Sequence, residues 1–205
     1  IVKAPTGAGK TVLASKIIER FYKGKKIVVL CHRLVLLEQL LGALKENHNV
    51  RKLEVSDDGP AFEDYNILLS TSLRARDVLS DAIAKADLII IDEAHRVSPN
   101  GKGYKRILDD FNERAKEKAP LLGLTASPER RTGDQRDQLN LAFDAIIDCA
   151  NIEDLIEEGV LVKPVYRPHF VHDLNLNSID ITSGDFPVEK LSNAIIRSSM
   201  IDYAI

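Results

Sequence analysis

The stretch Ala4-Pro-Thr-Gly-Ala-Gly-Lys-Thr11 decides the fold, because its residue types and order are those of a loop that wraps a triphosphate. Its small central residues let the backbone turn its N–H groups toward an anion. A helix beginning at Lys10 would add the positive end of its dipole. The pattern usually begins with glycine, so Ala4 makes this a variant of the loop.

Two side chains at the end of this loop have separate roles in phosphate chemistry. Lys10 supplies a fixed positive charge for the β- and γ-phosphates, and the Thr11 hydroxyl is placed to bind Mg²⁺. Taken alone, the eight residues could also be a glycine-rich turn before a surface lysine. The residues that we expect to bind the nucleotide are Pro5, Thr6, Gly7, Ala8, Gly9, Lys10 and Thr11.

A second motif, Asp92-Glu-Ala-His95, directly follows the apolar run Leu88–Ile91. Such a run is typical of a buried parallel strand, and ligands of open α/β sheets collect where these strands end. Asp92 could meet the magnesium ion there, and Glu93 could position and deprotonate the attacking water. A solvated acidic loop is the alternative, and the phosphate loop about eighty residues upstream favours the site.

The composition excludes some classes of protein. The 205 residues are 44% hydrophobic and 29% charged, as in globular proteins, and no apolar run approaches the roughly 20 residues of a membrane span. The net charge of −3 gives no global basic signal, so any contact with nucleic acid must come from a local patch.

The two cysteines, Cys31 and Cys149, are far apart in the sequence and form no metal-binding or disulfide pattern. They favour a reducing, intracellular location, which we take to be the cytoplasm. We expect both to be small core residues.

Strand-like and helix-like segments alternate, which predicts an α/β fold with a mainly parallel central sheet and helices on both faces. The expected strands are Ile27–Cys31, Val50–Val55, Asn66–Ser70, Asp87–Asp92 and Leu121–Thr125. The expected helices are Lys10–Tyr22, Leu34–Leu44, Ser72–Ala84 and Lys102–Lys118. A last strand and a short helix are expected within Leu139–Pro164, then an irregular connection over Tyr166–Pro187 and a helical pattern from Leu191.

Five motifs in this order resemble the first motor domain of superfamily 2 helicases of the DEAD/DEAH type, a RecA-like P-loop NTPase domain. They are Ala4–Thr11, Leu30–Leu34, Ser70–Leu73, Asp92–His95 and Gly123–Pro128. The segment Leu155–Pro164 is similar to that of type III restriction-subunit and RadD-like proteins. The resemblance covers residues 1–164, and residues 165–205 resemble the connection toward a second RecA-like domain.

The resemblance implies roles that chemistry alone does not give. Lys10, Thr11, Asp92 and Glu93 keep the roles argued above, with ATP and Mg²⁺ as the cofactors. His95 would also contact the nucleotide. Together with Thr125 and Ser127 it would couple the nucleotide state to the binding of nucleic acid and to domain closure. His95 could instead be an ordinary hydrogen-bonded histidine, and Ser127 part of a Ser-Pro turn.

On the nucleic-acid side, the resemblance places Arg33 and Ser72 at helix starts that hold a phosphate backbone without reading bases. Arg74 and Arg76 follow in the second of these helices, while Arg130 and Arg131 come after Pro128. Arginines on exposed helical faces are often merely solvated, which stays the alternative for all of them.

The resemblance implies ATP hydrolysis that drives DNA unwinding or translocation, with DNA favoured over RNA as the partner. The alternatives are an RNA helicase, an ATP-dependent nucleic-acid-binding switch, and a restriction-motor subunit that does not unwind. We expect an adenine-recognising segment before Ile1, and a second motor domain with an arginine finger after Ile205. Because such fingers supply roughly 10³ to 10⁵ in rate, this stretch alone should be poorly active.

Overall fold

The computed structural model describes residues 1–54, 57, 59, 62–71, 76–97, 104–114, 119–128, 139, 142–166, 179 and 188–197. The chain forms two compact units, Ile1–Val162 and Lys163–Ile205. In the second unit the described secondary structure is the helix α6 (Val188–Arg197). The five motifs named above belong to the first unit, and the segment Leu155–Pro164 crosses the boundary between the two units.

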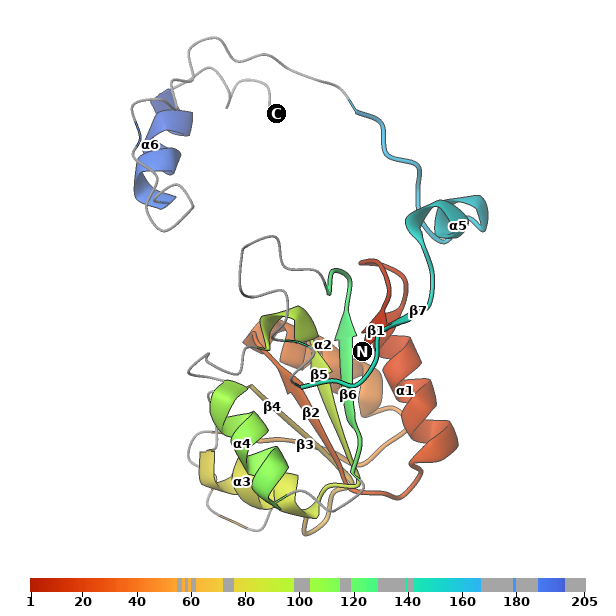
Figure 1. Ribbon diagram of the computed structural model, residues 1–205, viewed down its shortest axis with the longest axis vertical. Coiled ribbons are helices and arrows are strands. Elements are labelled where there is room, and N and C mark those ends of the chain that lie inside the picture. The colour runs from red at the N-terminus through yellow and green to blue at the C-terminus, as the bar shows by residue number, and fades with distance from the viewer. Residues whose placement is uncertain are drawn as a thin grey trace. The chain divides into compact units, whose positions relative to one another are not determined.

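The first unit is built on a seven-stranded sheet in the order β3-β4-β2-β5-β6-β1-β7 (Figure 1). Every described strand pair is parallel, which confirms the predicted α/β, RecA-like class. The strands are β1 (Val2–Lys3), β2 (Ile27–Cys31), β3 (Val50–Lys52), β4 (Ile67–Thr71), β5 (Leu88–Asp92), β6 (Leu121–Thr125) and β7 (Ile147–Asp148).

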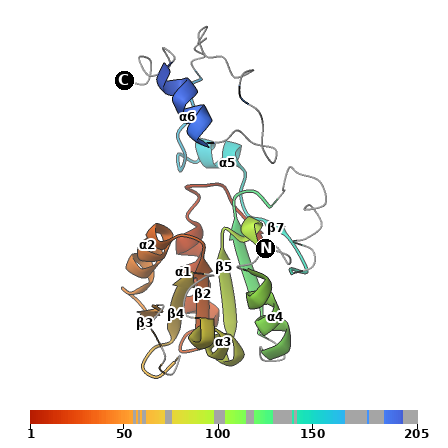
Figure 2. The ribbon, with the colours of Figure 1, turned by 90° about the vertical axis from the view of Figure 1, so that its left-hand side faces the viewer.

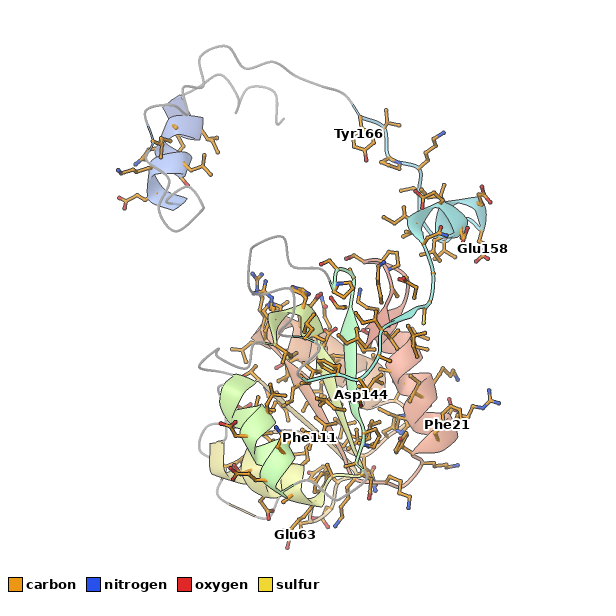
Figure 3. The ribbon with its side chains drawn as sticks, in the orientation of Figure 1. Phe21, Glu63, Phe111, Asp144, Glu158 and Tyr166 are labelled. Atoms are coloured by element: carbon orange, nitrogen blue, oxygen red, sulfur yellow. The ribbon has the colours of Figure 1, made fainter. Side chains whose placement is uncertain are left out.

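Helices cover both faces of this sheet. The helices α1 (Lys10–Phe21) and α2 (Leu34–Leu44) contact each other on one face, and α3 (Arg76–Lys85) contacts α4 (Tyr104–Arg114) on the other. Figure 2 shows the sheet between these two pairs. In Figure 3, the labelled Phe21 marks the end of α1 and Phe111 marks α4. The remaining elements of the unit are the 3-10 turn η1 (Ala94–Arg96) and the helix α5 (Ile152–Glu157).

The central strands are buried on both faces, so their side chains divide between two cores. On β2, Val28 and Leu30 pack with α3 and α4, while Ile27, Val29 and Cys31 pack with α1 and α2. This two-residue alternation is the geometry of an extended chain. A strand that is apolar on both sides reads as a continuous hydrophobic run, which is why the sequence indicates β2 and β5 so clearly.

The strand expected over Val50–Val55 ends at Lys52, and some other predicted ends lie outside the described residues. The helix expected over Ser72–Ala84 is described from Arg76 to Lys85, and residues 72–75 lie outside the described part of the chain. The helix expected over Lys102–Lys118 is described only over Tyr104–Arg114. Within Leu139–Pro164 the predicted strand and helix are found as β7 and α5.

The prediction for the cysteines was half wrong. Cys31 is buried in β2, but Cys149, directly after the edge strand β7, is exposed. An edge strand has a neighbour on one side only, so less of the sheet covers the residues that follow it. Among the described helices, none has the length and apolar character that a membrane crossing requires.

Candidate nucleotide site

The phosphate loop joins β1 to α1 at the carboxyl edge of the sheet. Gly7 and Gly9 have φ angles of 85° and 80°, in a region that side chains disfavour, so these two positions need glycine. The Ala8 N–H donates to the Pro5 carbonyl at 3.1 Å, which closes the turn. Gly9 caps α1 without a side-chain hydrogen bond, so the first N–H groups of the helix remain available to an anion.

The Lys10 ammonium is held against its own loop. Its Nζ donates to the carbonyls of Ala4 at 3.2 Å and Pro5 at 3.3 Å. These are neutral acceptors, and a lysine bonds more strongly to a charged oxygen than to a carbonyl. The ammonium is therefore positioned where phosphate oxygens could replace the carbonyls.

Strand register brings the second motif to the same edge. Asp92 on β5 pairs with Leu124 on β6, and Leu124 pairs with Val2 on β1. Parallel strands place their carboxyl ends together, so Asp92 lies at the edge from which the phosphate loop leaves β1. The structure thus brings together two motifs that are about eighty residues apart.

The Asp92 carboxylate is in an environment that suits a bound cation. Burial raises the pKa of Asp92, the charge of Glu93 raises it further, and a hydrogen bond from the Glu93 N–H and the charge of Lys10 oppose this. A partly buried carboxylate whose ionised form is disfavoured gains from a positive ligand. With the Thr11 hydroxyl, it is a donor set of the hard oxygens that Mg²⁺ prefers. The loop and the carboxylate therefore fit a magnesium–triphosphate complex.

Glu93 sits in a strained turn that fixes its direction. Its φ of 53° is the only positive value among the described non-glycine residues. Left-handed backbone costs energy for such a residue and is found where surrounding contacts enforce it. Its Oε2 lies 3.2 Å from His95 Nδ1, so the carboxylate faces the histidine.

A hydrogen-bond network joins the two remaining motifs. His95 Nδ1 lies 2.9 Å from Thr125 Oγ1, and the Ser127 N–H donates to the same hydroxyl at 3.2 Å. Since a carboxylate only accepts, its contact with Nδ1 favours the tautomer in which Nδ1 carries the proton. The network runs from Glu93 through His95 and Thr125 to the backbone of Ser127, which gives a physical path for the coupling that we predicted for these residues.

Gly123 makes this network possible. A Cβ added there would come 2.8 Å from the Ala94 Cβ and 2.9 Å from the Phe143 ring. Only glycine lets β6 approach η1 so closely, and η1 carries His95 toward Thr125.

The predicted nucleic-acid contacts are less well defined. Arg33 caps α2 with extended backbone and an exposed side chain, and the cap has no side-chain hydrogen bond. Ser72 and Arg74 lie outside the described residues, as do Arg130, Arg131 and the side chain of Arg76. The roles of these residues stay predictions.

Sequence reasoning missed two neighbours of the site. Burial and the charges of Arg96 and Arg33 lower the pKa of His32, whose buried Nδ1 has no hydrogen-bond partner among the described residues. Leu161 packs on the phosphate loop, since a Cβ at Gly7 would lie 2.9 Å from its Cδ2. His32 follows the β2 strand end, a position that could have marked it, but nothing local to the sequence marks Leu161.

Comparison with known families identifies the chain. Residues 1–130 match the family described as type III restriction enzyme, res subunit. This match covers more than half of the 205 residues. The chain belongs to the type III restriction res-subunit family. Its matched region contains the phosphate loop, the Asp92–His95 motif and the Thr125–Ser127 segment, so the recognition of a superfamily 2 helicase motor domain is confirmed.

Among curated relatives, this res-subunit-family chain is 29% identical over 221 residues to putative helicase 22 of a Sulfolobus islandicus filamentous virus, covering 97% of the chain and 37% of the relative. It is 26% identical over 200 residues to the ATP-dependent DNA helicase mph1 of Sclerotinia sclerotiorum, covering 90% of the chain and 15% of the relative. The chain therefore spans well under half the length of these relatives.

Two solved structures are similar to this family member. The Pyrococcus furiosus Hef helicase domain has a TM-score of 0.57 at 28% identity, covering 72% of this chain and 34% of that one. The UvsW helicase of bacteriophage T4 has a TM-score of 0.53 at 20% identity, covering 73% and 54%, and shows the fold alone. The first unit is thus a helicase-type motor domain with a nucleotide-binding P-loop fold.

Proposed function

We propose that this domain binds ATP with Mg²⁺ and hydrolyses it to drive DNA unwinding or translocation, as the first motor domain of a superfamily 2 helicase. The observation that carries the proposal is the convergence of the Lys10 loop with the partly buried Asp92 carboxylate at one edge of the sheet. A phosphate loop alone could bind many anions. The Asp92 carboxylate at the same edge would repel phosphates unless a cation lay between them, so it favours a metal-bound nucleotide.

Each residue has a defined task in this proposal. The loop N–H groups and Lys10 hold the β- and γ-phosphates, while Thr11 and Asp92 hold Mg²⁺, which neutralises charge on the phosphates. Glu93 accepts a proton from the attacking water. Its contact with His95 orients the carboxylate. The same histidine also contacts Thr125, the last residue of β6, so a change at the carboxylate can reach that strand.

We propose residues 1–164 as the first RecA-like domain and residues 165–205 as the connection to a second one, which would supply the arginine finger. For DNA as the partner, support comes from a relative named as an ATP-dependent DNA helicase. Arg33 at the start of α2 offers a backbone-phosphate contact of the kind that positions a strand without reading its sequence. The presence of Glu93 favours hydrolysis over a switch that only binds ATP.

ATP turnover with matched single-stranded DNA, duplex DNA and RNA tests this function on the full-length protein. Stimulation by DNA is expected. If RNA alone stimulates, the DNA assignment is wrong, and if no nucleic acid stimulates an active ATPase, the motor assignment is wrong. A strand-separation assay with the same duplexes distinguishes a helicase, which separates the strands, from a restriction motor, which does not.

A further inference from the structure

The imidazole of His32 is a polar group beside the site that no role above uses. Its Nδ1 is buried and has no hydrogen-bond partner among the described residues. Burying a polar atom without a partner costs free energy, so such atoms are uncommon in folded proteins and each calls for an explanation. A second arrangement of the site in which Nδ1 gains a partner would recover this cost.

Strand register places His32 beside the turn that carries the proposed base. The strands β2 and β5 are neighbours in the sheet, and Leu30 on β2 pairs with Ile91 on β5 (Figure 2). Both side chains belong to the core on the α3 and α4 face. Continuing the register by two residues brings His32 level with Glu93, and the alternation of an extended chain returns His32 to that same face.

The charged and titratable groups that act on His32 come from its own segment and from the turn after β5. They are Arg33, Glu93, and the η1 residues His95 and Arg96. Burial, followed by the charges of Arg96 and Arg33, lowers the pKa of His32, so the ring is neutral at pH 7. A neutral imidazole has one donor and one acceptor nitrogen. The Glu93 carboxylate is the one anion of the four groups, so it is the strongest acceptor for a proton on Nδ1.

His32 is also joined through the chain to the proposed nucleic-acid contact. Arg33, the exposed residue at the start of α2, follows it directly. The Cys31 thiol donates to the Arg33 carbonyl at 3.3 Å, which closes the short turn from β2 into α2. A phosphate bound at Arg33 would pull on this turn, and the turn carries the His32 ring.

The Glu93 carboxylate can accept a second donor. Its Oε2 lies 3.2 Å from His95 Nδ1. An ionised carboxylate has about four lone-pair sites, so this contact leaves others open. Two donors would fix the direction of the carboxylate more firmly than one and would still leave a lone pair for the proton of the attacking water.

We propose that His32 is a positioning residue through which bound nucleic acid acts on Glu93. A backbone phosphate at Arg33 shifts the β2–α2 turn so that His32 Nδ1–H donates to the Glu93 carboxylate. Without nucleic acid, Nδ1 stays unpaired and Glu93 keeps its contact with His95. His32 therefore speeds hydrolysis only when nucleic acid is bound. The inference rests on the proposed function, which supplies Glu93 as the base and Arg33 as the contact.

His32→Leu in the full-length protein is the first test, because leucine fills similar space without a ring nitrogen. ATP turnover is titrated with whichever of single-stranded DNA, duplex DNA and RNA stimulates the wild type. Turnover at saturation should fall about tenfold, as expected for one hydrogen bond to a charged group. Basal turnover and the half-saturating concentration of nucleic acid should not change. A residue that only contacted nucleic acid would instead raise the half-saturating concentration.

A rescue variant and a matched control accompany it. In His32→Asn, the amide Nδ2 is at the position of the histidine Nδ1 and can donate, so most of the stimulation should return. His48→Leu makes the same change at a second histidine, whose Nε2 is also buried without a partner among the described residues. It lies beyond the other end of α2, where its N–H donates to the Leu44 carbonyl at 3.0 Å. This control should be stimulated as the wild type is.

A double-mutant cycle tests whether His32 acts through the base. In the Glu93→Gln background the group that His32 positions can no longer accept a proton, so adding His32→Leu should not slow single-turnover hydrolysis further. Independent roles for the two residues would make their effects multiply.

The outcomes separate the inference from the proposed function. If no nucleic acid stimulates the wild type, the proposed function fails and the inference fails with it. If the wild type is stimulated and His32→Leu is stimulated equally, the inference is wrong and the proposed function stands. The inference is also wrong if His32→Asn is no better than His32→Leu, if His48→Leu loses as much stimulation, or if the effects of His32→Leu and Glu93→Gln multiply. Should His32→Leu not fold, an unstimulated His32→Asn alone would overturn it.

Discussion

The two sides of the carboxyl edge of the sheet are organised differently. On the side of β1, β5 and β6, the functional groups are held by defined contacts. The Lys10 ammonium binds the carbonyls of its own loop, and a separate network links Glu93 to His95, His95 to Thr125, and the Thr125 hydroxyl to the Ser127 N–H. On the side of β2 and β4, Arg33 extends from the start of α2 with an exposed side chain.

This difference follows from the chemistry of the two ligands. Phosphate transfer needs a base, a cation site and an ammonium in fixed positions, so each residue type is required. A contact with a nucleic-acid backbone needs only positive charge and helix N–H groups, which many residues can supply. Substitutions on the first side should therefore have larger effects than those on the second.

Glu93→Gln should have the largest effect on hydrolysis. The amide keeps the size of the side chain but cannot accept a proton, so turnover should fall at least about 100-fold while ATP still binds. Steady-state turnover measures the loss of hydrolysis, and calorimetry measures whether ATP still binds. Glu158→Gln, an exposed change after α5, is the control and should behave as the wild type. Normal turnover in Glu93→Gln would mean that another group is the base.

Thr125→Val should break the link between the motifs with a smaller loss. Valine has the same shape but leaves the Ser127 N–H and His95 without the shared hydroxyl. Stimulation of ATP turnover by nucleic acid should fall about tenfold in the full-length protein, with basal turnover less affected, because a lost bond to a buried partner costs about 1–3 kcal/mol. Thr125→Ser should restore stimulation. If serine fails to rescue, the hydroxyl is not the coupling group.

Arg33→Ala should weaken nucleic-acid binding a few-fold and leave ATP affinity unchanged. Loss of one phosphate contact should lower the slope of log affinity against log salt by about 1, uniformly across sequences. Arg20→Ala on α1, where the guanidinium lies 5.4 Å from the Phe21 ring, is the matched control. An unchanged slope would show that Arg33 is solvated.

Asp92→Asn should have the smallest of these effects, on thermal stability, where it should slightly raise the Tm of the nucleotide-free protein. The pKa of Asp92 is raised in the folded state, so its ionised form costs stability at neutral pH. Wild-type stability should gain as pH falls through this raised pKa, and the variant should lose that gain. Asp81→Asn, which removes an exposed ion pair with Lys85, should not raise Tm. A lower Tm in Asp92→Asn would contradict the burial argument.

The sequence predicts the fold well for strands that are buried on both faces of the sheet. Runs such as Ile27–Cys31 and Leu121–Thr125 are found as strands over the predicted residues, because an apolar stretch of this length bounded by turn signals has few alternatives. A weaker apolar pattern was less accurate: the strand predicted over Val50–Val55 ends at Lys52. Local patterns do not fix where an element ends to within one or two residues.

The site was predictable in its residue types but not in its surroundings. The loop and Asp92 follow from phosphate chemistry, whereas the contact of Leu161 with Gly7 depends on a chain separation of over 150 residues, which no local pattern records. Cys149 was placed in the core because cysteine is usually buried, and only the sheet order shows that it follows an edge strand.

ATP binding by Lys10→Ala tests the central claim most directly. Calorimetric titration in the presence of Mg²⁺ should show one ATP bound to the wild type and an affinity at least about tenfold lower in Lys10→Ala, since the ammonium faces the phosphates. Lys16→Ala on the same helix, which removes an exposed pair with Glu19, should bind as the wild type does. Equal affinity in Lys10→Ala and the wild type would contradict a nucleotide site on this loop.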